Sequence, residues 1–410
     1  MKKAIVLGGT IPHVDLILKL KQRGYYTILI DYNDNPPAKE VADKHIQEST
    51  LNKEKVLEIA KDHKIDLIIT SCIDQANCVA CYVGEKLGLP IPYSYETSLD
   101  VTKKGRMKEI FWNNNIPTAK YYVLESDDGS SPHIEYPIVI KPSDANSSKG
   151  VFKISNDKEF HEKIKESFSY SREGKTIVEK YISGAEIEAT CIAVNGKSTI
   201  LLTRDYEAYS IEGRELQNIN CSVPGKQCEK HYTELESICQ KIVDAFHLNT
   251  TPFFIQAICN DEGVFVLEFA PRIAGGTTYD MVHYYTGFDY LEASIKSFLH
   301  EPIEVNVIPN SKKYLTEFLY MKPGVFDRVD GVQELEQNGE IDRFFHYTNS
   351  GKVISESFNT GNRVGAVMVS ANTEEECSIK MDEVMKKISV KDVNGNDVKL
   401  RLKGSISRNE

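Results

Sequence analysis

The chain has 410 residues and a formal net charge of −11, with 41% hydrophobic and 27% charged residues. At about 150 residues per domain, this length predicts two to four domains. Proteins that bind DNA or RNA depend on many Lys and Arg contacts to phosphate, so the negative charge excludes nucleic acid as an expected partner. No apolar run approaches the roughly 18 residues that span a bilayer, so no membrane partner is expected.

The first residues and the cysteines indicate a cytoplasmic protein. MKKAIVLGG has about five apolar residues before its glycines, fewer than a signal peptide needs. Nine cysteines, an odd number, are scattered over the chain and do not resemble a disulfide framework. Cys78 and Cys81 form a CxxC pattern in a predicted helix, where two half-buried thiols explain them better than a redox or metal pair.

The N-terminal segments alternate between strand and helix patterns. Strands are predicted at 3–8, 25–31 and 67–71, and helices at 14–23, 53–62 and 76–87. This βαβ alternation predicts a Rossmann-like parallel sheet. The first turn, GGTIPH, departs from GxGxxG, so we expect a tight turn or the border of a non-nucleotide substrate rather than a dinucleotide site.

The later segments predict two further domains. A linker near residues 90–98 precedes a helix at 104–114, short strands around a polar loop, an antiparallel pair (EIEATCIAV and KSTILLTRDYEA) and a helix at 232–246. Short strands, glycines and a last helix at 374–387 follow residue 311. The fold class is therefore α/β and α+β multidomain, with domains at 1–97, 98–310 (a subdomain at about 115–181) and 311–410.

The segment 253–276 brings chemically useful side chains together. Two apolar runs, FFIQAI and VFVLEF, flank the turn cluster NDEG and predict a β-hairpin. A three-residue loop would set Gln256 and Glu268 directly opposite, and other loop lengths would set them on a diagonal. Strand alternation predicts Glu268 on the same face as Val264 and Val266, a face that looks buried.

A buried carboxylate needs a positive partner, and two partners fit this hairpin. Magnesium takes hard oxygen ligands such as those of Gln256 and Glu268, and Arg272 supplies a planar fork for a phosphoryl or carboxylate group. A surface hairpin with an ordinary Glu–Arg salt bridge explains the same residues. The hairpin alone does not separate the two interpretations.

Two other segments carry residues suited to a nucleotide. Lys141 lies at the end of the apolar strand PIVIKP, and the loop SDANSSKG after it offers backbone NH groups and Lys149 for phosphates, or forms a plain exposed turn. VEKYISGAEIE places Glu179, Lys180 and the backbone of 181–182 at a hinge that can read a purine edge. Surface charges on an edge strand are the alternative there.

Together these segments resemble the ATP-grasp superfamily over roughly residues 1–310. The resemblance implies three sources of phosphate contacts. They are Lys104, which opens the helix before IPT; Lys141, on a lid strand; and a lid loop with Ser148, Lys149 and Gly150. It implies adenine contacts from an EKxL-type hinge and a ribose-binding acid; these are Glu179, Lys180, Tyr181, Ile182 and Glu186. Gln256 and Glu268 match the magnesium pair, with Mn²⁺ as an alternative ion, and Arg272 matches the phosphate-facing arginine of ExNPR.

The sequence departs from the family pattern at two positions. Gln256 stands where most members carry Glu, as also occurs in carbamoyl-phosphate synthetases, and Ala270 replaces the usual Asn of the signature. Both changes bear on the second metal ion. EFAPRIAGG and the C-terminal region most resemble the L-amino acid ligases and related carboxylate–amine ligases, which implies that Arg272, Gly275 and Gly276 hold a substrate carboxylate or its acyl phosphate.

The resemblance implies an ATP-dependent ligase that joins a small carboxylate, such as an amino acid, to an amine through an acyl phosphate. Arg272, Lys141 and Lys149 would carry the charge stabilisation. Arg204, in LLTRDY, is either a further anion contact or part of a surface salt bridge. The alternatives are phosphorylation of bicarbonate or carbamate, and ATP binding without catalysis. A homodimer is the family expectation.

Overall fold

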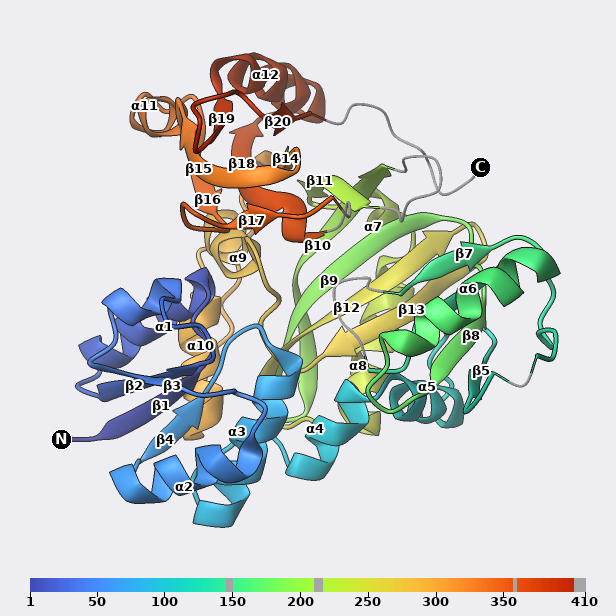
Figure 1. Ribbon diagram of the computed structural model, residues 1–410, viewed down its shortest axis with the longest axis horizontal. Helices are drawn as coiled ribbons and strands as arrows, with labels where there is room; N and C mark the ends of the chain where they lie inside the picture. Colours follow the sequence, from blue (N-terminus) through green and yellow to red (C-terminus); the bar gives the residue numbers. More distant parts are fainter. Residues whose placement is uncertain (128, 145–149, 210–216, 357–359, 402–410) are drawn as a thin grey trace.

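The computed structural model describes residues 1–127, 129–144, 150–209, 217–356 and 360–401. Figure 1 shows three regions around a long central sheet: a blue N-terminal sheet on one side, a green subdomain on the other, and orange to red C-terminal elements above. The predicted α/β and α+β multidomain class is confirmed. No helix within the described ranges is long and apolar enough to cross a bilayer.

The N-terminal region is the predicted parallel βαβ sheet, with strand order β3-β2-β1-β4. Its elements are β1 Lys3–Leu7, α1 Ile11–Gln22, β2 Tyr26–Asp31, η1 Pro37–Glu40, β3 Lys44–Gln47, α2 Lys53–His63, β4 Leu67–Ile69 and α3 Asp74–Leu87. The carboxyl ends of β1 and β4 therefore open toward α3. In parallel sheets this edge is where ligands bind.

Two helices connect this region to the rest of the chain. They are α4 Tyr95–Thr102 and α5 Lys104–Asn113. The expectation of a linker near 90–98 was partly wrong, because α4 begins at Tyr95. Ser94 caps that helix by accepting a hydrogen bond from the Thr97 N–H at 3.0 Å, a contact that only Ser, Thr, Asp or Asn makes well.

The green subdomain is an antiparallel sheet of order β5-β8-β6-β7 covered by one helix. Its elements are β5 Tyr121–Leu124, β6 Ile138–Pro142, β7 Phe152–Ile154, α6 Asp157–Ser169 and β8 Thr176–Lys180. Ile138, Ile140 and Ile154 of the sheet and Phe160 and Ile164 of α6 form a separate buried core. This subdomain therefore has its own core, as a lid requires.

The central sheet runs in the order β13-β12-β9-β10-β11-β14-β18-β16, with β20 on β14. Its first half and the helices around it are β9 Ala185–Val194, β10 Lys197–Tyr209, β11 Gln217–Val223, α7 Lys226–Lys230, α8 Tyr232–Ala245, β12 Thr251–Asn260, β13 Gly263–Ala270, α9 Thr278–Thr286 and α10 Tyr290–Leu299. Figure 1 shows β9, β12 and β13 between the N-terminal region and the lid subdomain.

The C-terminal strands continue the same sheet, because β14 pairs with β11. The elements are β14 Lys313–Met321, β15 Gly324–Asp330, α11 Val332–Gln337, β16 Arg343–His346, β17 Val353–Ile354, η2 Thr360–Asn362, β18 Arg363–Ala371, α12 Glu374–Lys387, β19 Ser389–Asp392 and β20 Lys399–Leu400. The last helix has its predicted bounds, and Thr373 and Glu376 form a capping box at its start.

Helix α10 joins the N-terminal region to the central sheet. Tyr290 is fully buried, and its hydroxyl donates to the carbonyls of Cys191 at 2.7 Å and Phe253 at 3.0 Å. On the outer side, Arg23, the residue that follows α1, pairs with Glu292 of α10 and, at 2.9 Å, with Glu301. The relative position of the two regions thus depends on contacts to α10.

Replacing Tyr290 with Phe tests that contact. The variant leaves two buried carbonyls without the hydroxyl, which should lower the free energy of unfolding by about 1–3 kcal/mol in a urea titration. Tyr284→Phe is the matched control, since that residue is 36% exposed and its hydroxyl is 3.4 Å from the Asp342 carbonyl. Equal effects of the two variants would contradict the expectation.

Candidate active site

The predicted hairpin is confirmed as β12 and β13, and Gln256 and Glu268 lie directly opposite each other. The route to this pairing differs from the prediction. The turn is a two-residue loop between Asn260 and Gly263, and a β-bulge at Leu267 then shifts the register by one residue. The bulge is what restores the direct pairing.

The same bulge makes one sequence-based expectation wrong. Val264 and Val266 point into the buried core, but Glu268 lies on the opposite face because the extra residue, Leu267, reverses the alternation. Its side chain is 40% exposed rather than buried. The carboxylate is therefore accessible to a ligand, and burial is not the reason that it attracts a cation.

Glu268 and Gln256 belong to a row of polar side chains across four strands. Glu188 of β9 is opposite Gln256, and Arg204 of β10 is opposite Glu188. Residues directly opposite in a sheet project from the same face, so the row runs from Glu268 through Gln256 and Glu188 to Arg204. Glu188 is not among the site residues predicted from the sequence.

The opposed pair fits magnesium chemically. One carboxylate and one amide oxygen are hard ligands of the kind that Mg²⁺ takes, with phosphate oxygens and water completing the shell. No group of three or more His, Cys, Asp and Glu side chains able to hold a metal occurs among the described residues.

Lys104 places a positive charge beside this pair. It is the first residue of α5, as predicted, and its Nζ is 3.6 Å from Glu268 Oε2. Its backbone N–H donates to the carbonyl of Ser143, which follows the lid strand β6. Lys104 thus stands where the lid subdomain meets the open face of the central sheet.

Lys141 and Glu179 are brought together inside the lid sheet. Lys141 Nζ donates to Glu179 Oε1 at 2.7 Å, and Lys108 Nζ is 2.8 Å from Glu179 Oε2. Lys108 is fully buried and also donates to Thr118 Oγ1 at 2.7 Å. The carboxylate of Glu179 therefore holds two lysines, a role that the sequence did not indicate, and its adenine contact stays a prediction.

Lys108 was missed by the sequence prediction although its position carries a signal. It follows Lys104 by four residues on α5, so the two lysines share one side of the helix. Lys108 and its neighbour Met107 are both buried. Burial lowers the pKa of Lys108 to about 8, although the charge of Glu179 partly offsets this effect. A lysine in such a place is stable only with its partner carboxylate.

Most hydrogen-bond donors of the hinge residues already have acceptors within the protein, and one backbone donor does not. The Lys180 side chain donates to the carbonyls of Glu135 at 3.0 Å and Tyr136 at 3.2 Å, and the backbone N–H of Tyr181 donates to Pro137 at 3.1 Å. Across the chain segments that the structure describes, the N–H of Ile182 has no hydrogen-bond acceptor. Ile182 is thus the hinge residue whose backbone donor is available to a base.

Glu186 lies two residues before Glu188 on β9, and its Oε1 accepts from Asn218 Nδ2 at 3.2 Å. Ser148 and Lys149 lie outside the described residues. Gly150 lies after that loop with φ of +71°, and a Cβ there would come within 2.7 Å of Tyr170 and 2.9 Å of Pro142. Only glycine fits this turn without strain.

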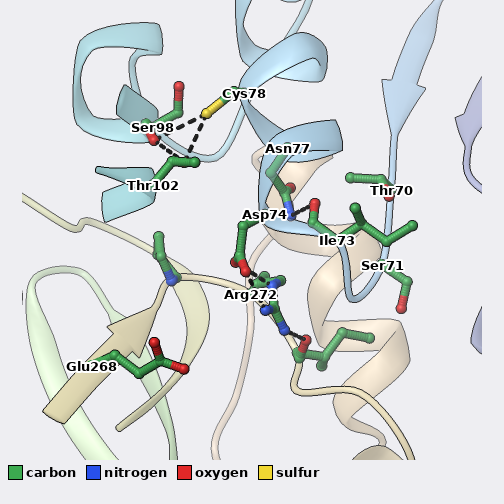
Figure 2. A network of polar contacts seen from close by, with 12 residues as sticks. Thr70, Ser71, Ile73, Asp74, Asn77, Cys78, Ser98, Thr102, Glu268 and Arg272 are labelled. Atoms are coloured by element: carbon green, nitrogen blue, oxygen red, sulfur yellow. Dashed lines mark hydrogen bonds and ion pairs between the residues drawn. The ribbon is translucent and has the colours of Figure 1, made fainter. Parts of the chain in front are cut away.

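Arg272 is held by the N-terminal region. Its Nε and Nη2 donate to the two carboxylate oxygens of Asp74 at 2.6 and 2.7 Å, its Nη1 donates to the Ile273 carbonyl at 2.9 Å, and its guanidinium lies 5.1 Å from the Phe254 ring centroid. Figure 2 shows the Asp74 and Arg272 side chains facing each other across the two regions. The predicted Glu–Arg alternative is not what forms, since the carboxylate comes from α3.

Asp74 is anchored in turn. It begins α3, and the same helix carries Cys78, whose Sγ is 3.1 Å from the Ser98 carbonyl and 2.9 Å from Thr102 Oγ1 in α4 (Figure 2). Burial raises the pKa of the Cys78 thiol, so it stays neutral. Because α4 leads directly into α5, this chain of contacts joins Arg272 to the helix that carries Lys104.

The glycines after Arg272 border two other regions. A Cβ on Gly275 would lie 3.7 Å from Cys72, at the carboxyl edge of the N-terminal sheet, and a Cβ on Gly276 would lie 3.2 Å from the Tyr347 hydroxyl of the C-terminal part. Gly276 has φ of +68°, which favours glycine. The loop therefore lies where the three regions meet, and Tyr347 is a site residue that sequence alone did not indicate.

The Glu179 cluster should make the protein acid-sensitive. Burial would raise the pKa of Glu179, but the charges of Lys108 and Lys141 outweigh it and lower this pKa to about 2, below the ordinary value of 4.5. Its contribution to stability is therefore complete above pH 4.5 and is lost as the pH falls toward 2. At pH 7, Glu179→Gln should cost about 3–5 kcal/mol of unfolding free energy, because two buried lysines lose their anion.

Denaturant titrations of wild type and Glu179→Gln between pH 7 and pH 2 check this, and the gap should close below pH 4.5. Glu125→Gln is the control, because that carboxylate is 74% exposed in its pair with Lys175 and should cost less than about 1 kcal/mol. A gap that is independent of pH would contradict the assignment.

Asp74→Asn tests the contact to Arg272. The amide keeps the shape but loses the charge and one acceptor, so Arg272 should shift and turnover should fall by about 100-fold. Glu58→Gln, on an exposed pair of α2, is the matched control. Wild-type initial rates of ADP release from the Asp74 variant would show that Arg272 acts without this partner.

Comparison with known proteins finds family matches for two parts of the chain. A model described as the ATP-grasp domain matches residues 134–280, and one described as L-amino acid ligase C-terminal domain 2 matches residues 317–392. The crystal structure of an L-amino acid ligase from Bacillus licheniformis superimposes with a TM-score of 0.78 at 17% identity, over 95% of this chain and 98% of that one.

Two curated relatives are ligases. A 3-methyl-D-ornithine–L-lysine ligase from Methanosarcina barkeri is 22% identical over 84% of this chain and 87% of its own length. A D-alanine–D-alanine ligase from Pediococcus pentosaceus is 28% identical over 44% of this chain, and the match spans about half (51%) of that protein. The chain therefore contains a region similar to the ATP-grasp domain and a later region similar to the C-terminal domain 2 of L-amino acid ligases.

Proposed function

We propose that the protein is an ATP-dependent carboxylate–amine ligase that forms an amide through an acyl phosphate. The observation that carries this proposal is the direct pairing of Gln256 and Glu268 on the open face of the sheet, with Lys104 3.6 Å from Glu268. Arg272 follows four residues after Glu268, at the end of the same hairpin. Oxygen ligands and two cations thus converge where the lid, the sheet and the N-terminal region meet.

ATP would lie between the lid sheet and the central sheet. The free N–H of Ile182 suits adenine, and Glu186 suits the ribose hydroxyls. Lys104, Lys141 and the loop that contains Ser148, Lys149 and Gly150 suit the phosphates. Gln256 and Glu268 would hold magnesium, which when bound supplies positive charge to the β- and γ-phosphates. Because Lys141 is paired with Glu179, its charge would act on phosphate from within a buried pair.

The proposed reaction has two steps. A carboxylate oxygen of the first substrate attacks the γ-phosphorus, the bond to the β-phosphate oxygen breaks, and ADP leaves. The amine nitrogen of the second substrate then attacks the acyl carbon, the bond to the phosphate oxygen breaks, and a proton passes from nitrogen to phosphate or solvent. The products are an amide, ADP and phosphate, and no protein group is consumed.

The protein contributes position and charge rather than a nucleophile. Lys104 and Lys149 would neutralise the transferred phosphoryl group. Arg272, fixed by Asp74, would hold the carboxylate and then its acyl phosphate, with the backbone of Gly275 and Gly276 beside it. Asp74 already accepts hydrogen bonds from Nε and Nη2 of Arg272. The substrate would therefore bind the guanidinium on another side or displace Asp74.

An amino acid as a substrate is the finer part of the proposal. The C-terminal domain of the L-amino acid ligase type supports it, as does similarity to a ligase whose name specifies two amino acids. The domain is in place to take part, because Tyr347 lies against Gly276. The identity of the two substrates has to come from assay.

Glu268→Gln tests the proposed function. The amide keeps the size of the side chain but removes the one carboxylate of the pair, so magnesium-dependent ADP formation should fall by about 100- to 1000-fold. Glu262→Gln, an exposed carboxylate in the turn of the same hairpin, should turn over normally. Both proteins are assayed with ATP, magnesium and a panel of amino acids, with the amide product followed by mass spectrometry.

The outcomes separate the proposal from its alternatives. ADP formation that requires both an amino acid and an amine, with a matching amide product, supports the ligase. Turnover with bicarbonate or one carboxylate and no amine would instead indicate a phosphorylating enzyme. ATP binding by wild type without turnover on any substrate would indicate a non-catalytic protein, and normal turnover in Glu268→Gln would remove the assigned metal pair.

A further inference from the structure

Three cations of the proposed site lie within the described residues, and each is paired with a carboxylate of the chain. The pairs and their N–O distances are Arg272–Asp74 at 2.6 Å, Lys141–Glu179 at 2.7 Å and Lys104–Glu268 at 3.6 Å. These cations are therefore neutralised by the protein itself. A nucleotide or an anionic substrate that uses one of them has to compete with the paired carboxylate.

The pair of Lys104 and Glu268 is the one that opens most easily. Its separation of 3.6 Å is longer than a hydrogen bond, and its side chains are 16% and 40% exposed. In the pair of Lys141 and Glu179 the side chains are 9% and 4% exposed. Ion pairs in contact with water contribute little to stability, so Lys104 can leave Glu268 at little cost. Its backbone is anchored by the hydrogen bond to Ser143, and only the side chain has to move.

The charges of the row explain why this pair matters for a metal ion. Gln256 and Glu268 carry one negative charge between them, because Gln256 is an amide, and Lys104 cancels that charge. The next carboxylate, Glu188, is matched by Arg204 at 3.4 Å, with both side chains 3% exposed. Arg204 thus belongs to a buried ion pair and not to a surface salt bridge. Without a nucleotide, the row has no net charge with which to attract a divalent cation.

A bound polyphosphate reverses this balance. It carries several negative charges, so the ammonium of Lys104 gains more from the phosphates than from one carboxylate. The start of α5 favours the same move, because a helix N-terminus attracts anions and the first turn of α5 has no acidic residue. Glu268 then regains its full charge, and the phosphate oxygens add hard ligands of the kind that magnesium takes.

We propose that Lys104 takes the place of the metal ion beside Glu268 until a nucleotide draws its ammonium away, so that the site accepts a divalent cation only together with the nucleotide. Lys104 then determines when the metal binds, in addition to contacting phosphate. A free divalent cation meets a neutral pair and binds weakly. This inference rests on the proposed function and deepens it, because it assigns a regulation to the same site.

Binding of Mn²⁺ tests this inference without turnover. Each protein is titrated with Mn²⁺ in the presence and absence of ADP, and the free ion is measured by its electron paramagnetic resonance signal. A titration of ADP alone corrects for the Mn²⁺ that the nucleotide holds in solution. The wild type should bind Mn²⁺ at least about 10-fold more tightly with ADP. Without ADP, Lys104→Met should bind Mn²⁺ about 10- to 100-fold more tightly than the wild type, because the repulsion between an ammonium and a divalent cation is removed.

Three further variants separate the local effect from a change in total charge. Gln256→Glu adds a second carboxylate that Lys104 does not neutralise, so this variant should also bind Mn²⁺ without ADP. Lys104→Met combined with Glu268→Gln should lose the gain, because no carboxylate of the pair is left. Lys158→Met removes the same charge from the exposed pair of Lys158 and Glu162 in α6, and it should bind Mn²⁺ like the wild type.

Two results would overturn the inference. One is equal Mn²⁺ affinity of the wild type and Lys104→Met without ADP, and the other is a wild-type affinity that does not depend on ADP. Lys104→Ala is measured in parallel and covers the case in which Lys104→Met fails to fold. Failure of the proposed ligase function would look different, because no amide would form while the nucleotide dependence of Mn²⁺ binding stays intact.

Discussion

The bulge at Leu267 is the constraint on which the site depends. Without the extra residue, β13 would turn Glu268 into the core beside Val266, where a carboxylate has no partner. With it, one face of the sheet carries Glu268, Gln256, Glu188 and Arg204 in a single row. That row has oxygen ligands at one end and a cation at the other.

Three contacts connect the row to the rest of the molecule. Asp74 fixes Arg272 from the N-terminal region, Tyr347 borders Gly276 from the C-terminal region, and Lys104 links the lid to Glu268. Each contact joins segments far apart in the sequence. The site is thus complete only when the three regions are packed together, and the buried Tyr290 and the Arg23 pairs on α10 hold two of them in place. Stability and proposed catalysis share this framework.

Much of this architecture was predictable because it depends on local patterns. Hydrophobic periodicity gave the βαβ opening and the hairpin, and the bounds of the last helix were predicted correctly because its capping box is a short-range signal. The order of Lys104, Lys141, the 179–186 hinge and Arg272 indicated a resemblance to the ATP-grasp superfamily, and an ATP-grasp domain model matches residues 134–280. The roles of these residues, and those of Ser148 and Lys149, stay predictions.

The errors and omissions have physical causes. A bulge has no fixed sequence signature, so simple alternation put Glu268 on the wrong face. Asp74 pairs with a residue 198 positions away, and no periodicity reveals such a contact. The pairing of Glu179 with Lys108 and Lys141 was not predicted, because no sequence pattern shows that these charges meet. In each case the missing information is the tertiary structure, because it decides which charged side chains meet when distant segments pack together.

Oxygen transfer tests the central claim most directly. A donor carboxylate labelled with ¹⁸O is incubated with ATP, magnesium, the protein and the amine, and the released phosphate is analysed by mass spectrometry. If an acyl phosphate forms, one carboxylate oxygen bridges carbon and phosphorus and leaves with the phosphate, so one ¹⁸O per turnover should appear there. Amide formation with unlabelled phosphate would contradict the account.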